Sequence, residues 1–348
     1  VERLRFGAAG LAEPGETGTK PGGRSPGAGD PGYTVRFSEM PRGLPRGGLL
    51  FWLCFSLAVG RAADAPAPAH AHAAGAPASV PDFTQFGIDE KSGSRPRQVD
   101  PVDTALPLAL RRGDRVVFIG NTLFERAADF PHFEAMLHAG HPELDLVVRT
   151  LAWSADEIDL MPRPKNFGDI QQHLTAQKAD VIFAAFGFNE SFGGVERLPE
   201  FRARLARFIT GLKTSAYNGR TAPRIVLVSP IASENVPGVP AADLNNARLA
   251  AYTRAMEAAA AEHKIGFVNV FDATKAALDD PKSDLTYNGV HLEDAGYALL
   301  AKRLYEGTFV SPPPRPTAEL VVAIADQNRQ FFRRYRPLNT YYYTGDRN

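Results

Sequence analysis

Five short apolar runs, partly β-branched, alternate with segments of helical pattern between residues 100 and 310. Strands that alternate with helices favour a parallel sheet covered by helices on both faces. The sequence therefore predicts one three-layer α/β/α domain with a five-stranded parallel sheet. The expected strands are Arg115–Ile119, Leu144–Leu151, Val181–Phe186, Ile225–Val228 and Ile265–Val270.

The segments between the runs carry apolar residues at helical spacing. In Leu198–Leu212, Phe201, Leu205 and Ile209 share one face and arginines lie opposite. A further helix, Ala318–Arg334, follows a proline break at residues 312–314 and opens a C-terminal arm, residues 311–348. The other expected helices are Phe130–His138, Phe167–Ala176, Leu244–His263 and Asp294–Tyr305.

The N-terminal residues do not read as part of this domain. Residues 1–39 lack an apolar period and are interpreted as a disordered or spurious extension. Residues 40–63 have a signal-peptide pattern: Met40, basic Arg42 and Arg46, an apolar run and small residues before the end. The run is too short to cross a bilayer comfortably, which predicts cleavage without stable membrane insertion; an uncleaved anchor is the alternative. Residues 64–99 are predicted to be a Pro/Ala-rich linker.

Charge and cysteine content exclude several classes of function. The formal net charge is +0, so no strong field favours nucleic acid or an anionic membrane. Cys54 is the single cysteine and falls in the expected signal peptide, which leaves no disulfide framework and no thiolate metal site. The chain has neither a metal-ligand constellation nor a phosphate-binding loop, and we expect no cofactor and no metal.

Three polar residues follow expected strands. Thr122 comes after the first strand, Asn189 after the third, and His291 between the last strand and a helix. Ligands of parallel sheets bind at the carboxyl ends of the strands, where these residues would meet. A hydroxyl, a base and an oxyanion donor are the groups that acyl transfer needs.

Four sequence blocks in this order resemble the SGNH/GDSL esterase–acylhydrolase family over about residues 113–308. They are Gly120-Asn121-Thr122, Trp153-Ser154-Ala155-Asp156, Gly187-Phe188-Asn189-Glu190 and Asn288-Gly289-Val290-His291-Leu292. The resemblance implies a flavodoxin-like sheet and an ester hydrolase. The Asn189 block and the C-terminal arm look like a divergent subgroup of secreted planctomycete- and verrucomicrobia-type proteins.

The resemblance also implies roles for single residues. Thr122 stands where the family has its nucleophilic serine, and His291 is the general base. The oxyanion donors would be the backbone N–H groups of Thr122 and Ala155 and the side chain of Asn189. Ala155 replaces a glycine of the family pattern.

Two family aspartates are replaced by amides. Asn121 stands beside the nucleophile, and Asn288 stands three residues before the base. Asn288 carries no charge, so it cannot stabilise the imidazolium that forms during catalysis. Asp284, Glu293 or Asp294 could supply a carboxylate instead.

Several alternatives stay open on the sequence. Asn121 or Thr122 could simply cap a helix. Ser154 and Ser191 are alternative hydroxyls at the same rim, and Trp153 is either a pocket wall or a core aromatic. The arm could pack on the domain or present a surface for a ligand or partner module.

We therefore predict a secreted or periplasmic ester hydrolase that removes acetyl groups from an extracellular carbohydrate or glycan. Its expected partner is a small-molecule or glycan ester, not nucleic acid. The alternative is an SGNH-fold glycan-binding or scaffold domain whose catalysis is impaired.

Overall fold

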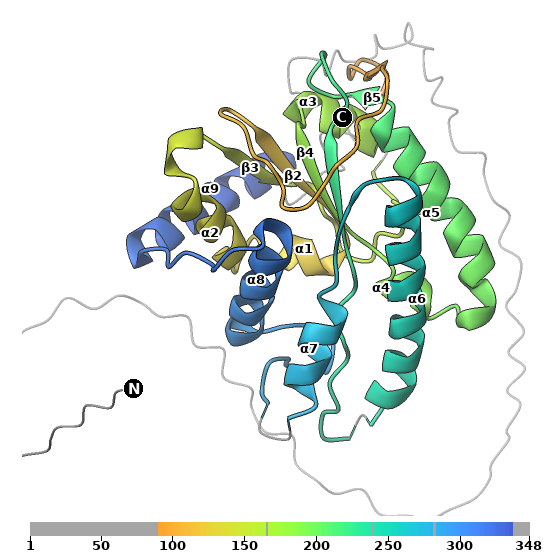
Figure 1. Cartoon of the computed structure of the whole chain (residues 1–348). Helices are drawn as coiled ribbons and strands as arrows, with labels where there is room; N and C mark the ends of the chain where they lie inside the picture. The colour runs from red at the N-terminus through yellow and green to blue at the C-terminus, as the bar shows by residue number, and fades with distance from the viewer. Residues whose placement is uncertain (1–89, 165, 239, 281–282, 337–348) are drawn as a thin grey trace, which may run out of the picture. The chain divides into compact units, whose positions relative to one another are not determined.

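The computed structural model describes residues 90–164, 166–238, 240–280 and 283–336 (Figure 1). The predicted extension, the signal peptide and most of the linker lie outside the described residues, as does the end of the arm.

A five-stranded parallel sheet forms the centre, as predicted. Its order is β3 (Val147–Thr150), β2 (Arg115–Gly120), β4 (Val181–Ala185), β6 (Arg224–Val228), β7 (Gly266–Val268). The first strand in the chain therefore lies second in the sheet, and the strand order reverses between β2 and β4. A crevice forms at such a reversal, beyond the carboxyl ends of the strands.

Helices cover both faces of the sheet (Figure 1). Along β2, Val116 and Phe118 join the core beneath α2 (His132–Gly140) and α8 (Asp294–Phe309). Val117 and Ile119 point the other way, into the core beneath α5 (Leu198–Lys213) and α6 (Ala242–Glu262). This alternation follows from the two-residue period of a strand. The remaining helices are α1 (Thr122–Arg126), α3 (Ile170–Gln177), α4 (Phe188–Ser191), α7 (Phe271–Leu278) and α9 (Ala318–Tyr335).

The structure differs from the sequence prediction in a few elements. The second strand begins at Val147 instead of Leu144, because a 3-10 turn at Pro142–Leu144 and a left-handed Asp145 precede it. The short helix α1 was expected only as a helix that Asn121 or Thr122 could cap, and α4 and α7 were not predicted. Neither was the small antiparallel pair β1 (Arg97–Gln98) and β5 (Ser215–Ala216).

Helix α9 packs on α2 and β3. Asn328 is buried, and its Nδ2 donates to the buried carboxylate of Glu134 on α2 at 2.8 Å. Phe331 and Tyr335 pack against the core that lies beneath α5 and α6. The guanidinium of Arg149 lies 5.3 Å from the Phe331 ring. In the described part of the chain, no helix is both long and apolar enough for a bilayer crossing.

Candidate active site

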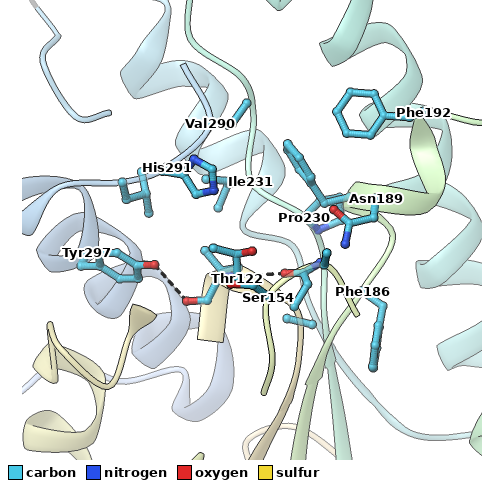
Figure 2. A pocket seen from close by; sticks show the side chains of 16 residues that line it. Thr122, Ser154, Phe186, Asn189, Phe192, Pro230, Ile231, Val290, His291 and Tyr297 are labelled. Carbon is cyan, nitrogen blue, oxygen red and sulfur yellow. Dashed lines mark hydrogen bonds between the residues drawn. The ribbon is translucent and has the colours of Figure 1, made fainter. Parts of the chain in front are cut away.

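A pocket of about 400 Å³ opens at the carboxyl ends of β2 and β4 (Figure 2). Figure 2 shows Thr122, Asn189 and His291 around one open space. Asn121 and Ala155 also line it, and Asn288 stands behind His291. The structure thus brings all the sequence-predicted site residues together. Much of the rest of the wall is apolar: Leu123, Phe186, Phe188, Phe192, Pro230, Ile231, Val290 and Leu292.

Asn121 is the residue that caps helix α1. Its Oδ1 accepts the N–H of Leu123 at 3.2 Å, and the side chain is buried. Thr122 is the first helical residue, so its hydroxyl is not needed as the cap. Gly120 has φ +129, and a Cβ there would lie 2.1 Å from the carbonyl oxygen of Ala185. Glycine therefore lets β2 deliver Thr122 close beside β4.

The expected oxyanion donors, Thr122, Ala155 and Asn189, form part of the wall of the pocket. Ala155 has φ +64, a left-handed conformation that alanine adopts at a cost of about 1–2 kcal/mol, so the family's backbone donor position survives the loss of glycine. Within the described residues, the N–H groups of Thr122 and Ala155 donate to no other protein group. Asn189 uses one Nδ2 proton to reach the Asp156 carbonyl oxygen at 3.2 Å, which leaves its second proton for a ligand.

Glu190 holds this wall in place, a role that the sequence reasoning missed. Its carboxylate accepts the N–H of Gly187 at 2.8 Å and the N–H of Ile158 at 3.1 Å. Burial raises the pKa of Glu190 to about 7. The sequence could have indicated this role, because an acidic residue directly follows Asn189 and the strand before it is a buried apolar run.

His291 lies on a loop that is held by hydrogen bonds of the Gly289 main chain. The Gly289 carbonyl oxygen accepts the N–H of Glu234 at 2.7 Å, and the Gly289 N–H donates to Thr286 Oγ1 at 2.9 Å. The His291 ring stacks on Tyr287, with centroids 5.4 Å apart. Burial and the nearby Arg126 guanidinium lower the pKa of His291, which favours the neutral, basic imidazole.

The Asn288 amide lies against Nδ1 of His291. Its Oδ1 accepts the main-chain N–H of His291 at 3.0 Å and that of Val290 at 3.3 Å. Nδ2 lies 2.9 Å from Nδ1 of His291, and Oδ1 lies 3.1 Å from the same atom. Nδ1 therefore accepts from Nδ2 in one neutral tautomer and donates to Oδ1 in the other. In the first tautomer the ring proton is on Nε2; in the second Nε2 is free, as a general base requires.

The candidate replacement carboxylates do not contact the base. Asp294 binds His132 Nε2 at 2.8 Å, and Asp284 and Glu293 are exposed. Among the described residues, no carboxylate hydrogen-bonds His291, and no hydrogen bond joins the Thr122 hydroxyl to the ring. Such catalytic bonds are often long before substrate binds.

The alternative hydroxyls are engaged elsewhere. Ser191 is buried and donates to the Phe188 carbonyl oxygen at 2.6 Å. Ser154 donates to the carboxylate of Glu125 on α1. Trp153 does not line the pocket: Arg336 and Arg163 lie over its ring, with guanidinium carbons 3.8 and 4.3 Å from the centroid. Trp153 thereby anchors the C-terminal helix.

In the part of the chain that the structure describes, no group of three or more His, Cys, Asp or Glu residues could hold a metal ion. The pocket itself presents a hydroxyl, an imidazole and hydrogen-bond donors. These groups and the parallel sheet define a hydrolase of the acyl-transfer type.

Comparison with known proteins agrees with this class. Residues 118–299 match the model of the GDSL-like Lipase/Acylhydrolase family, which is more than half of the chain. The chain belongs to this family, and it is a carboxylic ester hydrolase by membership.

Solved structures with a similar fold are distant in sequence. An acetylxylan esterase from Geobacillus stearothermophilus is 18% identical with a TM-score of 0.45, over 58% of this chain and 96% of that chain. A putative GDSL-like lipase from Parabacteroides merdae is 16% identical with a TM-score of 0.47, over 58% and 99%. No curated protein matches the chain.

Proposed function

We propose that this protein is a serine-hydrolase-type esterase in which Thr122 replaces serine, and that it acts on ester groups of an extracellular carbohydrate. The observation that carries the proposal is the convergence of Thr122, Asn189 and His291 on one pocket from three separate segments (Figure 2). A secreted or periplasmic location is part of the proposal and follows from the pattern of residues 40–63.

The steps follow from the positions of the groups. Thr122 Oγ attacks the ester carbonyl carbon while His291 Nε2 takes the hydroxyl proton. The N–H groups of Thr122 and Ala155, with Asn189 Nδ2, hold the oxyanion. The intermediate collapses, His291 protonates the departing alkoxide, and the acyl group stays on Thr122. Water, deprotonated by His291, then releases the acid and restores the hydroxyl.

A second candidate function is an SGNH-fold glycan-binding domain with impaired catalysis. The observation that favours it is the contact of Asn288 Nδ2 with His291 Nδ1, because the tautomer that accepts this bond carries the imidazole proton on the reacting nitrogen. In a serine protease, the same Asp-to-Asn change lowers turnover by about 10⁴.

Hydrolysis of 4-nitrophenyl acetate and of an acetylated monosaccharide by the full chain tests the proposal. Thr122→Ala and His291→Ala should each abolish turnover, whereas Thr210→Ala, at an exposed position of α5, should not change it. Activity that survives Thr122→Ala would exclude the threonine nucleophile. Absence of wild-type turnover on both esters would favour the binding domain.

A further inference from the structure

A second hollow of about 420 Å³ adjoins the active-site pocket and shares Thr122, Ser154 and His291 with it. We call it the α9 hollow, because Asn328, Arg329 and Phe332 of helix α9 form one of its walls. Helix α9 lies outside residues 118–299, which match the family. One wall of this hollow therefore comes from outside the matched range. The remaining lining residues are Glu125, Arg126, Ala128, Asp129 and Tyr287.

The position of His291 in the α9 hollow indicates which part of the ester the hollow would hold. His291 must protonate the departing alkoxide, so the alcohol portion lies beside His291. His291 lines both spaces, but the pocket proper is walled largely by apolar groups such as Phe186 and Ile231. The apolar pocket suits the acyl group, and the α9 hollow suits the alcohol.

The charges in the hollow are not balanced. Glu125 pairs with Arg336 and accepts the Ser154 hydroxyl, so its charge is already compensated. Among the described residues, no carboxylate pairs with Arg126 or Arg329. Asp129 is exposed and is the remaining acid of the hollow, so the positive charge is in excess.

Aromatic contacts orient the Arg126 guanidinium in a way that suits an anion. Its guanidinium carbon lies 5.3 Å from the Tyr287 centroid and 5.6 Å from the Phe130 centroid. The guanidinium interacts with the Tyr297 hydroxyl, and the bond that its Nη2 makes to the Leu292 carbonyl oxygen is long, 3.4 Å. Its buried Nε has no partner in the described structure. A guanidinium whose orientation is fixed by aromatic rings, and which keeps a donor without a partner, can match a carboxylate.

We propose that the α9 hollow binds the alcohol part of the ester and that this alcohol carries a carboxylate, contacted by Arg126 and Arg329. The substrate class is then an acyl ester of a hydroxy acid such as an acidic sugar. The exposed faces of Tyr287 and Phe332 would flank its ring. This inference rests on the proposed esterase function for the reaction, but not for the binding.

The test compares an acetyl ester of methyl glucuronoside with the matching acetyl ester of methyl glucoside. We expect the full-length wild type to have a kcat/KM about tenfold higher on the acidic ester, as one charge-assisted contact allows. Arg329→Ala should lower this ratio, because it leaves Arg126 as the remaining contact to the carboxylate. Arg333→Ala removes the same charge from an exposed position of α9 outside the hollow and should preserve the ratio. Equal rates on the two esters, or a ratio indifferent to Arg329→Ala, would overturn the proposal.

Binding separates this proposal from the esterase proposal. Calorimetric titration with unesterified methyl glucuronoside should show binding that Arg329→Ala and Arg126→Gln weaken and that methyl glucoside does not reproduce. If the chain turned over no ester but bound the acid in this way, the esterase proposal would fail and the site would stand. If the chain hydrolysed 4-nitrophenyl acetate but did not discriminate between the two glycosides in either assay, the proposal for the α9 hollow would fail and the esterase proposal would stand.

Discussion

Asn288 Nδ2 lies 2.9 Å from Nδ1 of His291, on the side of the imidazole where the family has an aspartate. The Asn288 Oδ1 is occupied by the main-chain N–H groups of Val290 and His291. The amide therefore fixes the position of the ring but offers Nδ1 both a donor, Nδ2, and an acceptor, Oδ1. An aspartate would only accept from Nδ1 and would select the neutral tautomer whose Nε2 is free.

Asn288→Asp should raise esterase turnover. A carboxylate accepts the proton of Nδ1, frees Nε2 to act as the base and stabilises the imidazolium, so kcat should increase between about tenfold and about 10⁴-fold. The main-chain bonds to Oδ1 are retained, because either carboxylate oxygen can accept them. Stopped-flow or steady-state assays with 4-nitrophenyl acetate measure the change. A lower kcat for Asn288→Asp than for wild type would rule out this account of the tautomer.

Thr122→Ser should also increase turnover. Threonine has a methyl group on Cβ that restricts χ1 and crowds the approach to the carbonyl carbon. Its removal should raise kcat by about two- to tenfold, which corresponds to the ~0.5–1.5 kcal/mol that an off-rotamer side chain costs. The backbone N–H of residue 122 is unchanged, so KM should move little. A fall in kcat would mean that the methyl group positions the hydroxyl productively.

The acid limb of the pH profile should depend on Arg126. Burial and the Arg126 charge lower the pKa of His291, so the neutral base persists to lower pH than an ordinary histidine allows. Arg126→Gln removes one of these two causes, raises the pKa of His291, and should shift the acid limb of kcat/KM to higher pH. The uncharged 4-nitrophenyl acetate keeps substrate binding out of the comparison. An unmoved limb would show that burial alone sets this pKa.

The sheet was predictable because its central strands β2, β4 and β6 are nearly continuous apolar runs that are buried on both faces. The site residues were predictable because they directly follow such runs: Thr122 after β2 and Asn189 after β4. The short helix α4 was not predicted and α1 was indicated only by its possible cap, since stretches of only a few residues carry no readable period. Their presence depends on Asn121 as a cap and on Glu190, whose carboxylate bonds the start of its own helix.

Contacts across long sequence separations were not predictable. The position of Arg329 beside His291 results from α9 docking on α2, which depends on the buried pair of Glu134 and Asn328. Nothing in a one-dimensional pattern connects these residues. Similarly, the sequence allowed Asn288 Oδ1 to accept from His291, whereas main-chain donors at Val290 and His291 compete for that oxygen.

Gly289→Ala should severely reduce activity. Gly289 has φ +88, and a Cβ there would lie 2.7 Å from the carbonyl oxygen of Glu234. Relief of the clash moves the loop that carries His291, and a displacement near 1 Å costs about 10²-fold in rate. Gly211→Ala is the matched control, since a Cβ at that position on α5 meets nothing within 4 Å. Near-normal activity of Gly289→Ala would show that the loop does not fix the base.

The docking of α9 should make stability depend on pH. Burial raises the pKa of Glu134 from 4.5 to about 7. Between these two pH values the folded protein therefore binds a proton that the unfolded chain has lost. Stability is therefore greatest below about pH 4.5 for this group and falls as pH rises to about 7, by at most about 3 kcal/mol. Glu134→Gln keeps an oxygen acceptor for Asn328 and should flatten this part of the curve, whereas Glu143→Gln, at an exposed position, should not. Urea denaturation at several pH values measures the difference. Parallel curves for Glu134→Gln and wild type would mean that Glu134 stays ionised, and that Asn328 donates to a charged carboxylate across the whole range.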